Sequence, residues 1–335
     1  MIPATGREVR LVARPVGEPD PSDFELAQAP VREPDEGEIL VRNEWISVDP
    51  YMRGRMNDVK SYTPPFKLGE PMEGGAVGTV IASRSKIPEG ATVLHGLGWR
   101  EYATLDAGSA RPVDPERAPA QAYLGVLGMT GLTAYAGLTE IAPVQDGDVV
   151  FVSGAAGAVG GVAGQIARRL GASRVIGSAG GPEKAAKLTK DFGYDAAIDY
   201  REGELERQLS EAAPNGIDVY FDNVGGDHLR AAIAVLNTYG RVAMCGAVSQ
   251  YNKTKPDPGP DNLFQAVGKR LTLRGFIVGD HQKLMGEYVQ RASGWLREGS
   301  FHTEETVVEG IDNAVDAFLG MLKGRNVGKM LVQLK

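Results

Sequence analysis

The stretch VFVSGAAGAVGGVAGQIARRLG, residues 150–171, has a glycine-rich turn between a β-branched run and a helical pattern. It keeps the last two glycines of a G-x-G-x-x-G fingerprint, Gly157 and Gly160, and has Ala155 in place of the first. Gly157 lets the backbone approach a pyrophosphate, and Gly160 lets the helix pack close to the strand. Because N–H groups at a helix start attract anions, the stretch predicts a dinucleotide phosphate site. The alternative is an ordinary Gly/Ala turn between a strand and a packed helix.

The segment Gly177–Gly181, after the next β-rich run, indicates which dinucleotide binds. Sites for NAD usually place an Asp or Glu here to hold the ribose 2′-hydroxyl, and this segment has neither. Small residues leave room for a 2′-phosphate, and Lys184 can pair with it. Tyr200, at the end of the third expected strand, could lie on the adenine-ribose side. The pattern favours NADPH over NAD. The alternative for Lys184 is an ordinary solvated helix residue.

Zinc ligands are scarce in this chain. A closed thiolate site needs several cysteines, and the only one is Cys245. The four histidines, at positions 95, 228, 281 and 302, show no ligand spacing. We therefore expect no metal centre.

Composition narrows the class of protein. The 335 residues carry a net charge of −7 and no block of Lys and Arg, which argues against a nucleic-acid partner. The uncharged stretch 149–167 approaches membrane-spanning length, but its Gly and Ala content favours a buried strand, turn and helix. The first ten residues carry charges and no apolar run, so we expect no secretory signal. A single cysteine fits a reducing cytoplasm.

Two hydrophobic patterns surround the glycine-rich turn. Residues 1–125 contain short β-rich runs such as EILVRNEW and GGAVGTVIAS between Pro/Gly turns, which favours a small barrel or sandwich. From about Tyr123 onward, five β-rich runs alternate with four helical runs, as in a parallel doubly wound α/β sheet. The expected strands are 148–154, 173–180, 195–200, a strand and turn at 217–226, and 240–248. The expected helices are 158–171, 182–193, 203–213 and 227–237. The Pro-rich loop 249–262 is typical of a mobile connection or a lid.

The motifs AAGAVG, FDNVGG and CGAVSQYN, with VDPYMRGRM, GMTGLTAYAGL and GRNVGKMLV elsewhere, resemble one family over essentially the whole chain. This is the zinc-independent medium-chain dehydrogenase/reductase family, in its prostaglandin reductase (leukotriene B4 dehydrogenase) branch of double-bond reductases. The resemblance implies a GroES-like, mostly-β catalytic domain, residues 1–125 with 300–335, and a Rossmann NADP-binding domain, residues 126–299. It also implies a homodimer joined through the edges of the nucleotide sheets, with 271–280 as the edge strand. In this chain, Thr130 replaces an expected proline, and Met72 stands where zinc-dependent relatives carry a ligand histidine.

The resemblance also implies cofactor contacts. Ala158, Val159, Gly160 and Gly161 match the pyrophosphate turn, and Lys184 and Tyr200 match the adenosine-phosphate positions. The nicotinamide side would be lined by the following residues: Asn223, Cys245, Gly246, Ala247, Val248, Ser249, Tyr251, Phe276, Ile277, Val278, Met129 and Thr133, with Asn326 reaching the cofactor from the tail.

Without a Lewis acid, a conjugated enone is easier to reduce than a simple ketone. Hydride goes to the β-carbon, and the charge spreads to the carbonyl oxygen as an enolate, which hydroxyl donors can stabilise. We favour Tyr251 as this donor and Tyr51 as a substrate-pocket residue, with the cofactor ribose 2′-hydroxyl as the alternative donor. Arg53 and Arg55 are candidates to attract a substrate carboxylate, although ordinary ion pairing is favoured for both.

The sequence thus favours an NADPH-dependent reductase of α,β-unsaturated aldehydes and ketones, acting in the cytoplasm on a small-molecule substrate. Two alternatives stay open: an NADPH quinone oxidoreductase, and a catalytically weak NADPH-binding protein. Within the lead function, alkenals, cyclic enones, prostanoid-like ketones and phenylpropenals are all compatible with the sequence.

Overall fold

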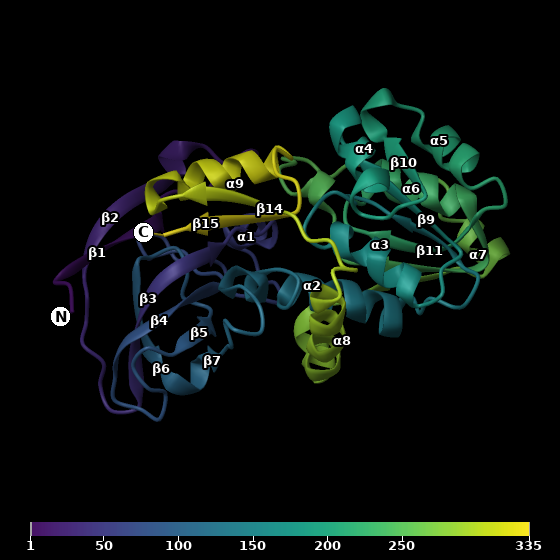
Figure 1. Cartoon of the computed structure of the whole chain (residues 1–335). Helices are drawn as coiled ribbons and strands as arrows, with labels where there is room; N and C mark the ends of the chain where they lie inside the picture. Colours follow the sequence, from purple (N-terminus) through teal and green to yellow (C-terminus); the bar gives the residue numbers. More distant parts are fainter. Residues whose placement is uncertain (1, 335) are drawn as a thin grey trace. The chain divides into compact units, whose positions relative to one another are not determined.

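The computed structural model describes residues 2–334, and the chain divides into two compact units. The described residues up to Gly125, with those from Glu305 onward, form the first unit. Val126–Glu304 form the second unit. In Figure 1 the first unit holds the purple and blue strands and the yellow C-terminal segment, and the second holds the teal and green elements.

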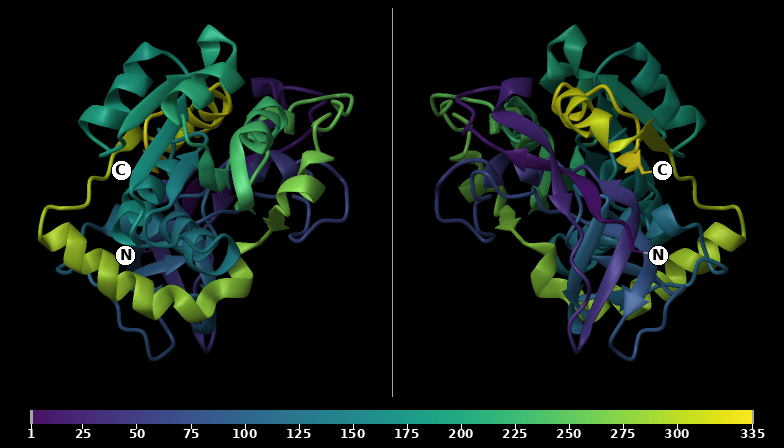
Figure 2. Two further views of the ribbon diagram at one scale, coloured as in Figure 1. Left: turned by 90° about the vertical axis from the view of Figure 1, so that its right-hand side faces the viewer. Right: turned by 90° about the vertical axis from the view of Figure 1, so that its left-hand side faces the viewer.

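The first unit is mostly β-structure. Its seven-stranded sheet has the order β14-β15-β3-β4-β5-β7, with β6 paired to β3, and only the β14–β15 pair is parallel. The C-terminal strand returns to the N-terminal region, because Leu331 of β15 pairs with Ser47 of β3. A separate ribbon of β1 and β2 is drawn in purple in Figure 2. The strands are β1 (Thr5–Leu11), β2 (Phe24–Pro30), β3 (Glu38–Ser47), β4 (Ala76–Ser83), β5 (Thr92–His95), β6 (Tyr102–Asp106), β7 (Arg111–Pro112), β14 (Glu305–Glu309) and β15 (Lys329–Gln333).

Helix α9 (Ala314–Leu322) closes the main core of the first unit. Its buried residues recur at helical spacing and pack with Met52 and Trp99; they are Ala314, Ala317, Phe318 and Met321. The Phe318 ring meets the Trp99 ring edge-on at 6.0 Å. The other helices of this unit are short: η1 (Pro21–Asp23), α1 (Tyr51–Arg55), η2 (Ala107–Ser109), η3 (Ala120–Leu124) and η8 (Ile311–Asn313).

The second unit contains the predicted doubly wound sheet. Its six strands are all parallel and have the order β10-β9-β8-β11-β12-β13, which is 3-2-1-4-5-6 in chain order. The strands are β8 (Val149–Val152), β9 (Arg174–Ala179), β10 (Ala196–Asp199), β11 (Ile217–Asp222), β12 (Leu236–Met244) and β13 (Thr272–Gly275). Strand β13, within the expected edge segment 271–280, lies at one end of this sheet. The predicted fold class is therefore confirmed.

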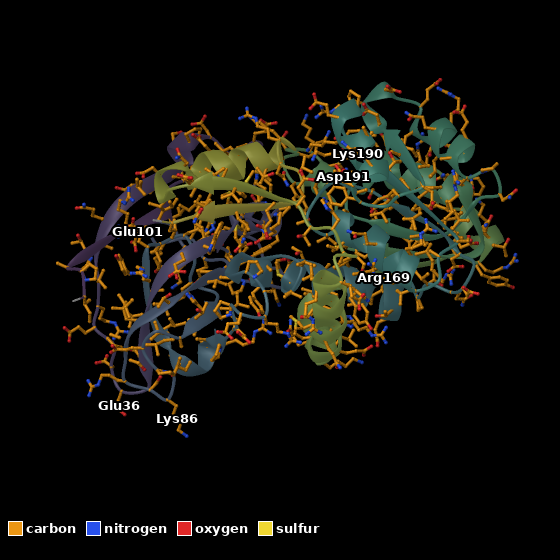
Figure 3. All side chains as sticks on the ribbon, in the orientation of Figure 1. Glu36, Lys86, Glu101, Arg169, Lys190 and Asp191 are labelled. Carbon is orange, nitrogen blue, oxygen red and sulfur yellow. The ribbon has the colours of Figure 1, made fainter. Side chains whose placement is uncertain are left out.

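Helices connect these strands as the periodicity predicts. They are α2 (Met129–Ala136), the π-helix η4 (Gly137–Ile141), α3 (Gly160–Arg169), α4 (Pro182–Lys190), η5 (Tyr200–Glu202), α5 (Leu205–Ala212), α6 (Gly226–Val235), η6 (Val248–Gln250), α7 (Gln265–Lys269), η7 (Val278–Leu284) and α8 (Met285–Arg297). Helices α3 and α4 end in basic residues, Arg169 and Lys190, which suits the negative end of the helix dipole (Figure 3). Within residues 2–334, no helix has the length and apolarity that crossing a membrane requires.

The boundary between α6 and β12 differs from the sequence prediction in kind, because residues expected at the end of a helix begin a strand. We expected helix 227–237, but Leu236 begins β12 and pairs with Ile217. A register shift follows, after which Arg241 pairs with Val219. Tyr239 within the irregularity has a positive φ of 67°. Local periodicity does not reveal such a bulge, because it is defined by pairing with the neighbouring strand.

Candidate functional site

The strand order places a binding crevice in the second unit. In an open parallel sheet, ligands bind at the carboxyl ends of the strands where the strand order reverses. That reversal lies between β8 and β11, which pair directly through Phe151 and Tyr220. The loops after β8, β9, β11 and β12 are therefore the candidate site.

The turn after β8 is shaped for close backbone approach. A Cβ added to Gly160 would lie 2.3 Å from the carbonyl oxygen of Gly154 and 2.6 Å from the Cα of Ala155, so only glycine fits there. The Ala155 N–H donates to the carbonyl of Ser178 in β9 at 2.9 Å, which joins the turn to the next strand. Val159 precedes α3 without a side-chain cap among the described residues. In the first turn of α3, the Gly161 N–H donates to the Gly157 carbonyl at 2.8 Å and the Val162 N–H donates to the Val159 carbonyl at 3.3 Å. An anion here would therefore be attracted mainly by the positive end of the helix dipole.

The turn after β9 carries the predicted adenosine-phosphate residues. Gly180 lies against the hydroxyl end of the Tyr200 side chain, because a Cβ added to it would lie 2.7 Å from the Tyr200 hydroxyl oxygen. Lys184 lies in the first turn of α4, and burial together with the Arg201 charge lowers its pKa. Arg201 was not predicted from the sequence, although it directly follows Tyr200. Its side chain reaches the same turn, with Nε 3.0 Å from the added Gly180 Cβ.

The end of β11 is fixed by a buried hydrogen-bond network. The Asn223 side-chain amide donates to the Ser153 carbonyl at 2.8 Å, and its backbone N–H donates to the Ser153 hydroxyl at 3.0 Å. Asp222 accepts hydrogen bonds from the Tyr220 hydroxyl at 2.6 Å and from the Gly225 N–H at 2.8 Å. Burial raises the pKa of Asp222, and these hydrogen bonds oppose the rise. The network holds the ends of β8 and β11 in register at the crevice.

The segment after β12 folds back over this edge. The N–H groups of Cys245 and Gly246 donate to the Asp222 carbonyl at 2.9 and 3.0 Å, and the Val248 N–H donates to the Asn223 carbonyl at 3.2 Å. The Ser249 hydroxyl donates to the Val224 carbonyl at 2.6 Å. Ala247 leads into η6, and burial raises the pKa of the Cys245 thiol to about 12.

Tyr251 follows η6 and turns back toward Gly246. A Cβ added to Gly246 would lie 3.3 Å from the Tyr251 hydroxyl oxygen and 3.4 Å from the Asn223 carbonyl oxygen. The hydroxyl therefore lies beside the carboxyl ends of β11 and β12. A phenol in this place can donate a hydrogen bond to a ligand bound at the crevice.

The remaining predicted contacts of the second unit lie after β13 and in α2. Phe276 follows β13 and packs edge-on against Phe221 of β11 at 6.4 Å; Ile277 and Val278 come next and lead into η7. Met129 is exposed at the start of α2, and the Thr133 hydroxyl donates to the Met129 carbonyl at 2.7 Å.

In the first unit, Tyr51 begins α1 and packs half-buried against the main core. Burial, and then the Asp49 carboxylate, raises the pKa of Tyr51, so the phenol keeps its proton at neutral pH. Asp49 is itself buried and pairs with Lys329 at 3.2 Å. In the C-terminal part of this unit, between α9 and β15, the Asn326 side-chain amide donates to the Gly328 carbonyl at 2.8 Å.

The two candidate carboxylate-attracting arginines already have partners. Arg53 is buried and donates to the Asn57 side chain at 2.9 Å and to the Gly17 carbonyl at 2.8 Å. Arg55 pairs with Glu73 at 2.7 Å. The Arg55 contact supports the ion-pairing interpretation of that residue, whereas these two Arg53 contacts are hydrogen bonds to neutral groups.

Thus the strand ends bring together two groups of predicted residues in the second unit. One group is at β8, β11 and β12: Ala158, Val159, Gly160, Gly161, Asn223, Cys245–Ser249 and Tyr251. The other is at β9 and β10: Lys184 and Tyr200, with Arg201 added. Residues 2–334 contain no group of three or more His, Cys, Asp or Glu side chains that could hold a metal ion.

Comparisons with known proteins agree with this architecture. A family described as the N-terminal domain of oxidoreductase matches residues 7–113, and a family described as zinc-binding dehydrogenase matches residues 158–294. The NADPH-dependent curcumin reductase of Escherichia coli is 39% identical and covers 97% of this chain and 95% of its own length. Mouse prostaglandin reductase 1 is 41% identical, with 95% of each chain covered. The crystal structure of CurA from Vibrio vulnificus in complex with NADPH has a TM-score of 0.94, 42% identity, and coverage of 98% of this chain and 99% of that one.

Proposed function

Because the chain belongs to the medium-chain dehydrogenase/reductase family of NADP-dependent oxidoreductases, we propose that it uses NADPH to reduce the C=C bond of α,β-unsaturated aldehydes and ketones. The observation that carries the proposal is the Tyr251 hydroxyl beside the carboxyl ends of β11 and β12. The E. coli relative is named for reducing curcumin with NADPH, and curcumin is a conjugated dienone.

The residues present fit NADPH. The Gly160 position leaves no room for a Cβ, as close packing beside a pyrophosphate requires, and residues 177–181 carry no acid that would repel a 2′-phosphate. Residues 158–161 would hold the pyrophosphate, and Lys184 and Tyr200 the 2′-phosphate. The contacts proposed for the nicotinamide side are Asn223, Cys245–Ser249, Tyr251, Phe276–Val278, Met129, Thr133 and Asn326. When bound, NADPH supplies the hydride that is added to the β-carbon.

Two hydroxyl groups of the chain serve the substrate in this proposal. Tyr251 donates a hydrogen bond to the substrate carbonyl oxygen and so stabilises the enolate as its charge develops. Tyr51 lines the substrate pocket as a neutral donor, which agrees with its raised pKa. A proton from solvent or from a positioned donor then reaches the α-carbon.

NADPH oxidation with three acceptors tests this function. We expect turnover of trans-2-nonenal to the saturated aldehyde, and no turnover of the saturated aldehyde itself. Turnover of a quinone alone would replace the proposal with a quinone oxidoreductase. Tight NADPH binding without turnover of any acceptor would favour a binding protein.

We also propose that the active form is a cytoplasmic homodimer joined through β13. The free edge of this strand can pair with a second copy. Large apolar side chains near it are exposed: Tyr239 at 67%, Phe264 at 74% and Val267 at 81%. Such a patch is typical of a protein–protein interface.

A further inference from the structure

Two cationic residues, Arg201 and Lys184, lie at the turn between β9 and α4 and are close enough for the Arg201 charge to act on Lys184. The Arg201 Nε lies 3.0 Å from a Cβ added to Gly180, and its terminal nitrogen lies 3.6 Å from one added to Gly181. The guanidinium therefore lies on the backbone of the turn after β9. Lys184 lies in the first turn of α4, which directly follows this turn, and its pKa is lowered by burial and by the nearby Arg201 charge.

Asp199 holds this arrangement in place. Its Oδ1 accepts hydrogen bonds from the Gly181 N–H at 2.8 Å and from the Arg201 N–H at 3.0 Å. One buried carboxylate oxygen thus joins the turn after β9 to η5 after β10. The position of the Arg201 backbone is fixed even though its side chain is exposed.

The Arg201 guanidinium has no carboxylate partner of its own in residues 2–334. Arg207, on the following helix, differs in this respect, because it pairs with Glu204 at 2.6 Å and with Glu211 at 2.8 Å. Two neighbouring cations disfavour each other's charged form, which favours the binding of an anion beside them.

A phosphate monoester has the charge and shape for this place. Near neutral pH it carries about −1.5 to −2 charges and three acceptor oxygens. A guanidinium can bind two of these oxygens side by side, while an ammonium acts as a point charge. The glycines of the turn add no side chain of their own, so Tyr200 and Arg201 are the side chains that line the space beside Gly180.

We propose that Arg201 is a second ligand of the cofactor 2′-phosphate and, with Lys184, sets the preference for NADPH over NADH. The inference rests on the proposed use of NADPH. It adds a specificity-determining residue to the contacts that the sequence predicts, and it assigns Asp199 as the residue that positions it.

Equilibrium binding of NADPH, NADH and adenosine 2′,5′-bisphosphate to the full chain tests the inference without any enone. We expect Arg201→Ala to raise the Kd for NADPH and for the bisphosphate by about tenfold or more, as for loss of a charge-assisted hydrogen bond. The Kd for NADH should change by less than about twofold. Arg201→Lys should retain part of the affinity, because it keeps the charge and loses the two-oxygen geometry.

The matched control is Arg207→Ala, which removes an arginine that is already paired with acids. It should leave all three constants unchanged. Equal losses for NADPH and NADH in Arg201→Ala would show a structural role and overturn the inference, as would unchanged NADPH binding. Either result leaves enone reduction by the wild-type chain intact, so the two proposals fail separately. A wild-type chain that binds NADH as tightly as NADPH would overturn the preference itself, and the inference with it.

Discussion

The methyl group of Ala155 occupies the space beside Gly177 of β9. A Cβ added to Gly177 would lie 2.8 Å from the Ala155 Cβ and 2.8 Å from the Tyr194 ring. The chain therefore tolerates alanine at the first glycine of the dinucleotide fingerprint because the adjacent strand carries a glycine opposite it. This explains how the phosphate turn keeps its form without the usual residue.

Gly177→Ala should destabilise the second unit. The added methyl group overpacks the contact between the turn and β9, at a cost of roughly 1–3 kcal/mol in the free energy of unfolding. Adding Ala155→Gly to the Gly177→Ala variant should restore only part of the lost free energy of unfolding, because the contact with Tyr194 remains. Urea unfolding of the wild type, both single variants and the double variant measures these values. Wild-type stability of Gly177→Ala would refute the packing explanation.

Tyr251→Phe should lower kcat for trans-2-nonenal by roughly 100-fold, the usual effect of removing one oxyanion donor. The Kd for NADPH should stay within about twofold if the ring keeps its position over Gly246. Tyr51→Phe is the comparison, and we expect it to act mainly on KM. An unchanged kcat in Tyr251→Phe would assign the donor role to the cofactor ribose 2′-hydroxyl.

Lys184→Ala should raise KM for NADPH by about tenfold and leave KM for NADH nearly unchanged, because only NADPH carries the 2′-phosphate. Lys190, at the opposite end of the same helix, provides the control substitution Lys190→Ala (Figure 3). Steady-state kinetics with both cofactors supplies the comparison. If the KM values for NADPH and NADH rose together, Lys184 would not be a ligand of the cofactor 2′-phosphate.

The sequence predicted the parallel sheet well because its strands are buried and read as continuous apolar runs. Strands β1 and β2 were not predicted, since charged residues such as Arg7, Glu8 and Arg10 hide the pattern of β1. This strand is defined by pairing with β2, which lies beyond a turn-rich segment.

The difference between local sequence patterns and strand pairing also explains which residues of the site could be predicted. Residues that follow parallel strands share one edge of the sheet. The glycine turn could be predicted from its own pattern, and Asn223 and the segment after β12 could be predicted from the family resemblance. Arg201 could not, because its approach to Gly180 depends on the pairing of Asp199 in β10 with Ala179 in β9. No local pattern encodes that register, and an exposed arginine after a strand is unremarkable by itself.

Val267→Asp should convert the proposed dimer to a monomer. A carboxylate in the exposed apolar patch near β13 would be desolvated on association and would face its own copy. Light scattering should give twice the 35.7 kDa chain mass for the wild type and the single mass for the variant. Val16→Asp changes a similarly exposed valine of the first unit and should leave the dimer intact. A monomeric wild type would contradict the proposal.

The buried histidines should make stability depend on pH. Burial lowers the pKa of His95 to about 4 and that of His228 to about 4, whereas an unfolded chain has a histidine pKa of about 6.5. Between these values the unfolded state binds more protons than the folded state. The stability due to the neutral rings is therefore complete above about pH 6.5 and is lost as the pH falls toward 4.

The free energy of unfolding should accordingly fall between pH 7 and pH 5, by up to roughly 1.4 kcal/mol per pH unit for each histidine. Asp222, whose pKa burial raises, acts in the opposite direction at lower pH, so the histidine contribution is best read from variants. His95→Gln should reduce the pH slope even though it lowers stability, because the hydrogen bond with Asn43 changes. His302→Gln, at an exposed position, should keep the wild-type slope. Equal slopes in all three proteins would show that the neutral ring of His95 contributes nothing to the acid sensitivity.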